Sequence, residues 1–496
     1  MMIVIDTDPK RVPENNATGQ GSSFMSTNTA ASPNAGQSSY GFSYNAPPPP
    51  PPPPSYYSYP SYSYQTTVIP AVVAVEYRQS PGARFCKAFA AAILVYFLVV
   101  GAVHTTANMA FDGIRWDDSV GAPRADDGTV LRSVGGSNWT FYHQNPSWSS
   151  RFPRSAEASF VLPVDSDELF LISRGSYQSG KVEVKQAPDV EQGSVKVDVR
   201  VAYHVDRALA RATVCELQKD GDRNGVGIFT PSPIRWINFN KQDELYFQVT
   251  YTFPAARAGR TPVHVKGFKT STGNYVYEIG DLWRAMMFDD IDVTTSNSHI
   301  QVESITFKRG SFASSNSHIR GHFNTSNSLT LRTSNGHIEA TASLFNDLGL
   351  ATTLVMTTSN SHITSAVALD THSGTGGLFD VKAHSSNGRV SLEYEDSPLD
   401  ARLTSRVTTS NSQASVKMHP AFEGSFEVTS SNIGPALIQN RVSDPSGKGR
   451  ERFVKQNRSG NRISGSVYWA ERSGARKDIK GSSSVQTSNS RASLEL

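Results

Sequence analysis

Four histidines share one position of a short repeated motif, and imidazole is a side chain that binds metal ions and takes up protons near neutral pH. If the copies of the motif stack on one face, the histidines form a metal-binding or proton-sensitive ladder. Other copies carry Leu329 and Arg389 at this position, which favours the alternative of exposed histidines within a structural repeat. The four residues are His299, His318, His337 and His362.

Residues 220–225 match the opening of a calcium-binding loop. Asp220, Asp222 and Asn224 supply oxygens at positions one, three and five, and Gly225 stands at position six. The twelfth position is Pro231 and not the bidentate glutamate that completes such a loop. The preferred interpretation is therefore a tight turn between two strands.

Two further acidic groups have the residue types of an active site. Asp165 and Asp167 resemble the metal-nucleotide pair of Golgi glycosyltransferases, but the chain lacks the alternating strands and helices that surround a nucleotide there. Asp289, Asp290 and Asp292 carry carboxylates of the kind that polysaccharide hydrolases and lyases use as acid and base. A solvated turn or coil edge is the default for both groups. We therefore expect no catalytic residue, cofactor or metal, with an extracellular carbohydrate-active β-helix enzyme as the alternative.

The histidines belong to a Thr-Ser-Asn-(Ser/Gly)-x-(Ile/Val) motif that recurs within residues 291–496. Successive asparagines of the motif are separated by 19, 11, 8, 25, 27, 24, 21 and 57 residues. Such a period is typical of a β-solenoid, in which each coil adds short strands to continuous parallel sheets. The repeat asparagines are Asn297, Asn316, Asn327, Asn335, Asn360, Asn387, Asn411, Asn432 and Asn489.

Asparagine has two physical reasons to recur at this position. It tolerates the left-handed backbone conformation that turns one short strand into the next. In stacked copies, each side-chain amide can also bond with the amides above and below it. The apolar residue that follows should point inward, as Ile300 and Val302 do if the strand alternates around Gln301.

The region before the repeat also predicts strands. Residues 158–290 contain alternating runs such as 195–201 (VKVDVRV) and 244–251 (ELYFQVTY), separated by Gly, Pro, Asn and Ser. Residues 108–157 are polar and rich in turn-forming residues, so we expect a stalk there. Residues 441–480 hold eleven Lys or Arg against four Asp or Glu, which predicts a basic insertion that projects from the solenoid. The expected fold of the exterior is all-β.

The first 83 residues have the composition of a disordered tail. They are rich in Ser, Asn, Gly, Pro and Tyr and contain eight consecutive prolines at 47–54. Pro53, Pro54 and Tyr56 fit the Pro-Pro-x-Tyr ligand of WW domains, and the proline run also suits SH3 domains and profilin. The alternative is a low-complexity spacer.

Residues 84–107 contain an uncharged apolar run that is long enough to cross a bilayer as a signal-anchor helix. Arg78, Arg84 and Lys87 precede the run and aspartates follow it, which predicts a cytosolic amino terminus and a type II protein of the plasma membrane or secretory pathway. Cys86 would then lie beside the bilayer, where palmitoylation and an unmodified thiol are equal alternatives. The predicted exterior carries N-glycosylation triplets at Asn138, Asn324 and Asn457.

Composition excludes two classes of protein. The 496 residues have a formal net charge of +3, which argues against a nucleic-acid binder that relies on a basic surface. Two cysteines are too few for a disulfide scaffold or a cysteine-rich zinc module.

The Thr-Ser-Asn motif resembles the repeats of putative adhesin domains in bacterial and fungal proteins. The arrangement of a Ser/Pro/Tyr-rich tail, one membrane helix and a repeat-bearing exterior is similar to that of fungal single-pass membrane proteins. The resemblance covers mainly residues 290–496 and supplies no catalytic residue. It implies a β-solenoid with a surface role, namely adhesion or contact with cell-wall or surface glycans.

Overall fold

The computed structural model describes residues 121–142, 151–231, 240–256, 261–347, 349–471 and 480–496. These residues belong to one compact unit, Gly101–Leu496. They form 27 strands and very little helix, so the described part of the chain is all-β, as predicted. The short helices are α2 (Asp206–Ala210), η1 (Ala125–Asp127), η2 (Gly136–Asn138) and η4 (Lys241–Asp243).

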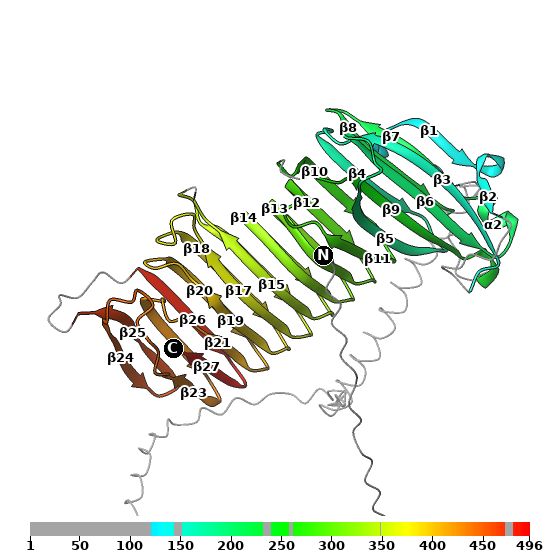
Figure 1. The fold of residues 1–496 in the computed structure, drawn as a ribbon. Helices are drawn as coiled ribbons and strands as arrows, with labels where there is room; N and C mark the ends of the chain where they lie inside the picture. Colours follow the sequence, from blue (N-terminus) through cyan, green and yellow to red (C-terminus); the bar gives the residue numbers. More distant parts are fainter. Residues whose placement is uncertain (1–120, 143–150, 232–239, 257–260, 348, 472–479) are drawn as a thin grey trace, which may run out of the picture. The chain divides into compact units, whose positions relative to one another are not determined.

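Most strands lie in two rows in which neighbours pair in parallel (Figure 1). The first row begins with β8 (Arg223–Phe229), β4 (Glu168–Arg174), β10 (Val263–Ser271) and β12 (Met286–Thr295). After two long strands that both rows share, it continues with β16 (Thr352–Thr358), β18 (Leu378–Ser385), β20 (Arg402–Thr409), β26 (Gly481–Thr487) and β22 (Gly424–Ser430). The second row is β9 (Leu245–Pro254), β5 (Gln178–Ala187), β11 (Tyr275–Asp281), then β15 (Ile338–Phe345), β17 (Ile363–Asp370), β19 (Val390–Asp396), β21 (Ala414–Lys417), β27 (Arg491–Glu495) and β23 (Ile433–Ile438).

Two long strands, β13 (Ile300–Ser314) and β14 (Ile319–Thr333), belong to both rows. The first half of β13 pairs with β11 through Ile300, and its second half pairs with β12 through Phe307. β14 follows the same path one step further along and pairs with β15 and β16. Each circuit of the chain therefore adds one strand to each row, and we call such a circuit a rung.

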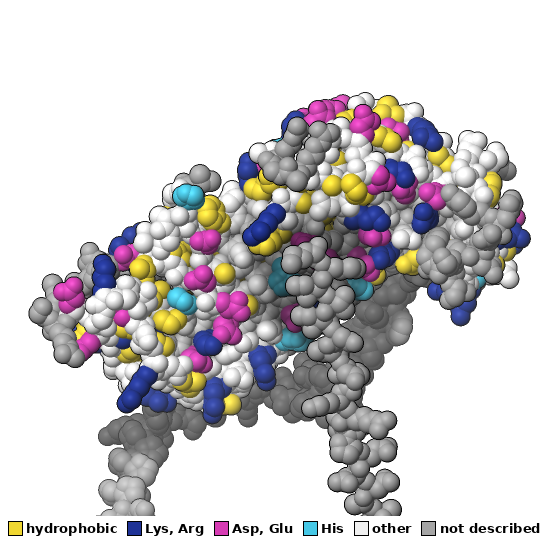
Figure 2. Space-filling model, viewed as in Figure 1, with side chains coloured by type: hydrophobic (Ala, Val, Ile, Leu, Met, Phe, Trp, Pro, Cys, Tyr) yellow, Lys and Arg dark blue, Asp and Glu magenta, His cyan; other side chains and the backbone are white. Residues whose placement is uncertain are grey.

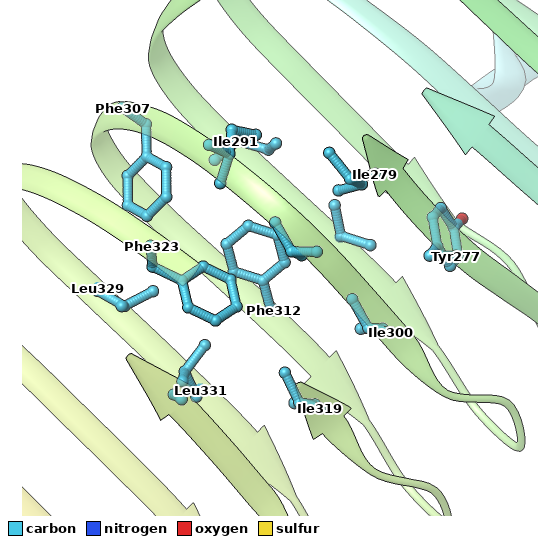
Figure 3. Packing of buried hydrophobic residues seen from close by; sticks show 14 of the residues in the cluster. Tyr277, Ile279, Ile291, Ile300, Phe307, Phe312, Ile319, Phe323, Leu329 and Leu331 are labelled. Atoms are coloured by element: carbon cyan, nitrogen blue, oxygen red, sulfur yellow. The ribbon is translucent and has the colours of Figure 1, made fainter. Parts of the chain in front are cut away.

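The core lies between the two rows. Along most strands of the two rows, alternate side chains point inward, so Ile300 and Val302 are buried while Gln301 is exposed, as predicted. The register places Ile300 beside Ile319 and Ile319 beside Ile338, so that one inward position forms a continuous apolar column. The packing of these columns is dense around Phe312 and Phe323, as Figure 3 shows.

Antiparallel strands cover the amino-terminal end of the stack. β6 (Ser194–Tyr203) pairs with β9, β3 (Arg154–Pro163) with β6, and β2 (Thr140–Tyr142) with β3. On the other row, β7 (Thr213–Lys219) pairs with β8, and β1 (Thr129–Gly135) pairs with β7. Strands β1 and β2 lie in the segment where we expected a polar stalk. They join the sheet because Val134 and Trp139 are buried in its core.

The carboxyl-terminal strands occupy an unexpected place. β26 pairs with β20 on one side and with β22 on the other, and β27 lies between β21 and β23 in the same way. The last rung of the sequence is thus inserted between two earlier rungs. The terminal amide of Leu496 donates to the carbonyl of Ile438, which fixes the chain end in this slot.

The basic segment 441–480 differs from the expected projecting insertion. It contains β24 (Glu451–Ser459) and β25 (Arg462–Ala470), which form an antiparallel hairpin. β25 pairs antiparallel with β22 and so covers the carboxyl-terminal edge of the first row. Because an open parallel edge exposes unpaired backbone groups, this hairpin acts as a cap of the stack.

Candidate functional site

One edge of the stack carries a continuous row of side-chain amides. In each rung, the Nδ2 of one asparagine donates to the Oδ1 of the asparagine in the neighbouring rung, over 2.6 to 3.0 Å. The side chains are exposed at the corner where the chain passes from the first row of strands to the second. We call this row the amide ladder; its members are Asn274, Asn297, Asn316, Asn335, Asn360, Asn387, Asn411, Asn489 and Asn432.

A second row of hydrogen bonds supports the amide ladder from inside. Two residues before most of these asparagines, a buried Thr or Ser hydroxyl donates to a backbone carbonyl of the neighbouring rung, as Thr358 does to Gly336 over 2.9 Å. These hydroxyls replace water for carbonyls that the corner would otherwise leave unpaired. The motif thus stabilises the corner by two sets of hydrogen bonds, one between side-chain amides and one from hydroxyls to carbonyls. The residues are Thr295, Ser314, Thr333, Thr358, Ser385, Thr409 and Thr487.

The expected left-handed backbone at the repeat asparagines is wrong. Among the described residues other than glycine, positive φ angles occur only at Tyr177, Asp222, Arg284 and Asp400. The amide-to-amide bonds, the second of the two expected reasons, therefore account for the recurrence of asparagine.

The structure brings eight of the nine predicted repeat asparagines into the amide ladder and places one elsewhere. Asn327 lies inside β14 and is exposed, and its backbone N–H donates to the hydroxyl of Thr325. Asn274 joins the ladder although the sequence reasoning missed it. The signal that could have found it is Thr272-Gly273-Asn274, which keeps the threonine two residues before the asparagine and has glycine in place of serine.

Beside the amide ladder, four imidazoles form a regular stack. Adjacent ring centroids are 4.8 Å apart and the ring planes are inclined by only 3° to 7°. Because the rings lie face to face, their nitrogen atoms do not converge on one point. In the described part of the chain, no group of three or more His, Cys, Asp or Glu side chains could hold a metal ion. The stack comprises His299, His318, His337 and His362.

Of the acidic residues 289, 290 and 292 considered for catalysis, the first two form ion pairs, and the carboxylate of Asp292 accepts from Thr294 over 3.3 Å. Asp289 accepts from Lys308 over 2.7 Å and from His264 over 3.0 Å, and these partners lower the pKa of its carboxyl group. Asp290 forms a two-bond pair with Arg309. A general acid needs a raised pKa, so this pairing argues against such a role for Asp289. On the face of the molecule that Figure 2 shows, charges of both signs are scattered and not gathered in one patch.

The other acidic segments form turns. Asp222 adopts a positive φ of 52° in the turn that joins β7 to β8, and the side-chain amide of Asn224 donates to its carboxylate over 3.0 Å. The same amide donates to Ser166 over 2.9 Å, which ties this turn to the turn before β4. Asp167 pairs with Lys266 over 2.8 Å.

The predicted modification sites have different surroundings. Asn138 is exposed at the end of η2, and Asn457 is exposed on β24. Asn324 is half-buried in β14, and its amide donates to the carbonyl of Ile305 over 3.2 Å.

The predicted tail, anchor and WW ligand lie outside the described residues. This applies to residues 1–83, to the helix expected at 84–107, to Pro53, Pro54 and Tyr56, and to Cys86. Within the part that the structure describes, no helix has the length and apolar character needed to cross a membrane.

No family model matches the sequence, and no curated protein matches it. Among solved structures, a putative adhesin from Parabacteroides merdae is 12% identical, with a TM-score of 0.31 over 53% of this chain and 88% of its own. A putative adhesin from Bacteroides fragilis is 10% identical, with a TM-score of 0.25 over 68% and 96%. A putative cell adhesion protein from Clostridium sporogenes is 6% identical, with a TM-score of 0.14 over 68% and 99%. All three are bacterial, and none supports the resemblance to fungal membrane proteins.

Proposed function

We propose that this chain is a non-enzymatic, single-pass membrane protein that displays a β-solenoid outside the cytosol for adhesion to cell-surface or cell-wall glycans. The observation that carries the proposal is the amide ladder, an exposed and regularly spaced row of hydrogen-bonding groups. Exposed serines such as Ser334 and Ser359 flank the asparagines and add hydroxyl groups to the same edge.

A rigid row of donors and acceptors suits a linear polymer of hydroxyl-bearing units. Single contacts with a sugar hydroxyl are weak because water competes for the same groups. Many equivalent contacts along one edge act together, since the first contact raises the effective concentration of the next. The stacked rungs hold the edge straight and so remove most of the ordering cost of binding.

The anchor and the tail complete the proposal. The apolar segment at 84–107 serves as the membrane helix, with residues 1–83 in the cytosol. There, Pro53, Pro54 and Tyr56 recruit a WW-domain protein, because the groove of that domain accepts a preformed polyproline helix followed by tyrosine. Tyr56→Ala should abolish capture of the full-length chain by an immobilised WW domain, and unchanged capture would refute this part.

The adhesion proposal is tested by incubating the full-length chain with insoluble cell-wall glycans. Retention of protein on the glycan is measured separately from release of soluble sugar. We expect retention without release, and weaker retention for the double substitution Asn335→Ala/Asn360→Ala, which interrupts the amide ladder. Asn327→Ala is the matched control because this exposed asparagine is outside the ladder. Sugar release by the wild type would refute the proposal, as would equal retention of the double variant and the control.

A further inference from the structure

The imidazole stack is one part of a longer row of basic side chains. The register of β17 and β19 places Arg389 directly beyond His362, because Ile363 pairs with Val390. Two rungs further, Ala414 pairs with Ala492, which places Arg491 on the same line after Gln413. We call this line the histidine row; its members are His299, His318, His337, His362, Arg389, Gln413 and Arg491.

Few acidic groups face the histidine row. Arg320 on β14 and Glu339 on β15 stand beside its middle and form a loose pair at 3.6 Å. Glu278 on β11 lies beyond the first rung of the row, and Lys181 of β5 binds its carboxylate at 2.5 Å. The charges of these two pairs cancel. The permanent charge of the row itself is therefore the positive charge of its two arginines.

The spacing makes protonation of the row costly while nothing is bound. Partial burial lowers the pKa values of His318 and His337, and the neighbouring imidazoles and Arg320 lower them further. Glu339 acts in the opposite direction on both. Two imidazolium rings at 4.8 Å repel each other, and an anion placed along the row would relieve that repulsion.

We propose that the histidine row is a binding strip for an acidic polysaccharide, and that it takes up this ligand when the imidazoles become protonated. The inference rests on the proposed function and names the ligand class and its regulation. A chain of uronic acid or sulfated sugars carries anions at regular intervals, as the row carries cations, while the adjacent amide ladder offers partners for the sugar hydroxyls. Proton uptake and anion binding are then reciprocally coupled.

The test measures affinity at two pH values with defined polymers. The full-length chain is titrated with polygalacturonate, dextran sulfate and neutral dextran at about pH 5 and about pH 7.5. We expect the affinity for both polyanions to rise about tenfold or more on acidification, with no change for dextran. Lys and Arg keep their charge across this range, so the basic hairpin at 451–470 contributes equally at both pH values.

Variants test whether the histidine row causes the gain in polyanion affinity on acidification. His318→Gln/His337→Gln should reduce the gain in affinity on acidification, whereas His372→Gln, an exposed histidine outside the row, should leave it intact. If the double variant does not fold by circular dichroism, Arg389→Gln is used, which should weaken polyanion binding at both pH values. A gain that persists in full in the folded double variant, or normal polyanion binding by Arg389→Gln, overturns the inference.

The outcomes also separate this inference from the proposed function. Retention on wall glycans with equal polyanion affinity at both pH values overturns the inference and leaves the adhesion proposal standing. Failure to bind any glycan at either pH overturns both.

Discussion

The imidazoles of His318 and His337 lie face to face, with centroids 4.8 Å apart and planes inclined by 7°. Backbone register places them side by side, because Ile319 pairs with Ile338 and each histidine directly precedes its isoleucine. A repeated residue in a parallel stack necessarily lies beside its own copies. A titratable side chain in such a repeat therefore experiences the charge of its copies, which gives the stack its dependence on pH.

Stability should decrease as the pH falls through the histidine range. His318 and His337 have lowered pKa values in the folded chain, so between those values and the unfolded value of about 6.5 the unfolded chain binds more protons. The free energy of unfolding then falls as the pH drops below about 6.5 and levels off below the folded pKa values. Urea unfolding at a series of pH values measures this effect.

The control must allow for His419, which is half-buried and also has a lowered pKa. Protonation of His419 therefore also lowers the free energy of unfolding as the pH falls. His318→Gln/His337→Gln in a His419→Gln background should flatten the curve above about pH 5 compared with His419→Gln alone. Identical curves for the two proteins would show that the imidazole stack does not destabilise the fold at acidic pH.

Removing one amide from the middle of the ladder should weaken the stack modestly. Asn335 bonds to Asn316 and to Asn360, each over 2.7 Å, at an exposed edge. Asn335→Ala should lower the free energy of unfolding by about 1 kcal/mol, because each solvent-exposed hydrogen bond contributes about half of that. Asn327→Ala should change it by less than about 0.5 kcal/mol. Equal effects of the two substitutions in denaturant titrations would argue against a stabilising ladder.

A partly buried ion pair should stabilise the segment before the capping hairpin. The Asp444 carboxylate accepts from Arg450 over 2.9 Å and from the amides of Ser446 and Lys448, and these contacts keep its pKa well below the usual range. Arg450 also reaches Glu423 over 3.3 Å.

Asp444→Asn should therefore destabilise the chain by about 1.5 to 3 kcal/mol, since it removes the charged acceptor of several hydrogen bonds and leaves Arg450 with Glu423 alone. Because the folded pKa is lowered, the contribution of Asp444 is present above about pH 4 and is lost as the pH falls further. The difference in unfolding free energy between wild type and variant should shrink correspondingly in acid. A difference that is constant down to about pH 2 would contradict the assignment.

The sequence predicted strands and parallel stacking because each rung repeats one local pattern. The buried hydroxyl, the asparagine and the inward residue of a copy such as Thr358, Asn360 and Ile363 all act on nearest neighbours, so spacing alone reveals them. Asn327 belongs to a copy of the same motif at a different position in the rung. Its copy comes 11 residues after Asn316, whereas a full rung there takes 19. Asn327 therefore lies where β14 passes from the second row back to the first, and not at the corner that carries the amide ladder.

The order of the last rungs was beyond the reach of sequence spacing. The separation of 57 residues between Asn432 and Asn489 predicts a long insertion between consecutive rungs. In the structure Asn489 lies between Asn411 and Asn432, so the chain passes one rung, forms the hairpin and returns. Such a return depends on pairing between segments that are distant in the sequence, so local composition does not predict it.

The three glycosylation triplets should differ in use if the exterior passes through the secretory pathway. Asn138 and Asn457 are exposed, whereas the amide of Asn324 is bonded to Ile305 and Thr325 beside it is buried. Mass spectrometry of the full-length chain, purified from the membranes of a eukaryotic host, should find glycan at Asn138 and Asn457 and none at Asn324. Glycan at Asn324 would mean that β14 forms only after modification.

The inserted last rung should behave as a separable part of the fold. Val485 is fully buried between Val407 and Val428, and Leu494 is buried in the same rung. Each contributes about 1.5 to 3 kcal/mol on burial. Deleting residues 480–496 removes these contacts and leaves β20 and β22 without a shared neighbour.

Stability in a stack of rungs is carried by contacts between neighbours, so the damage from this deletion should stay local. Hydrogen exchange should show lost protection in residues 402–438, while residues 300–345 stay protected. A synthetic peptide of residues 480–496 added in trans should restore protection, because the slot offers it two parallel edges. A peptide of the same composition in scrambled order is the control. Full protection of β22 and β23 without the segment would mean that the hairpin cap alone holds this end of the stack.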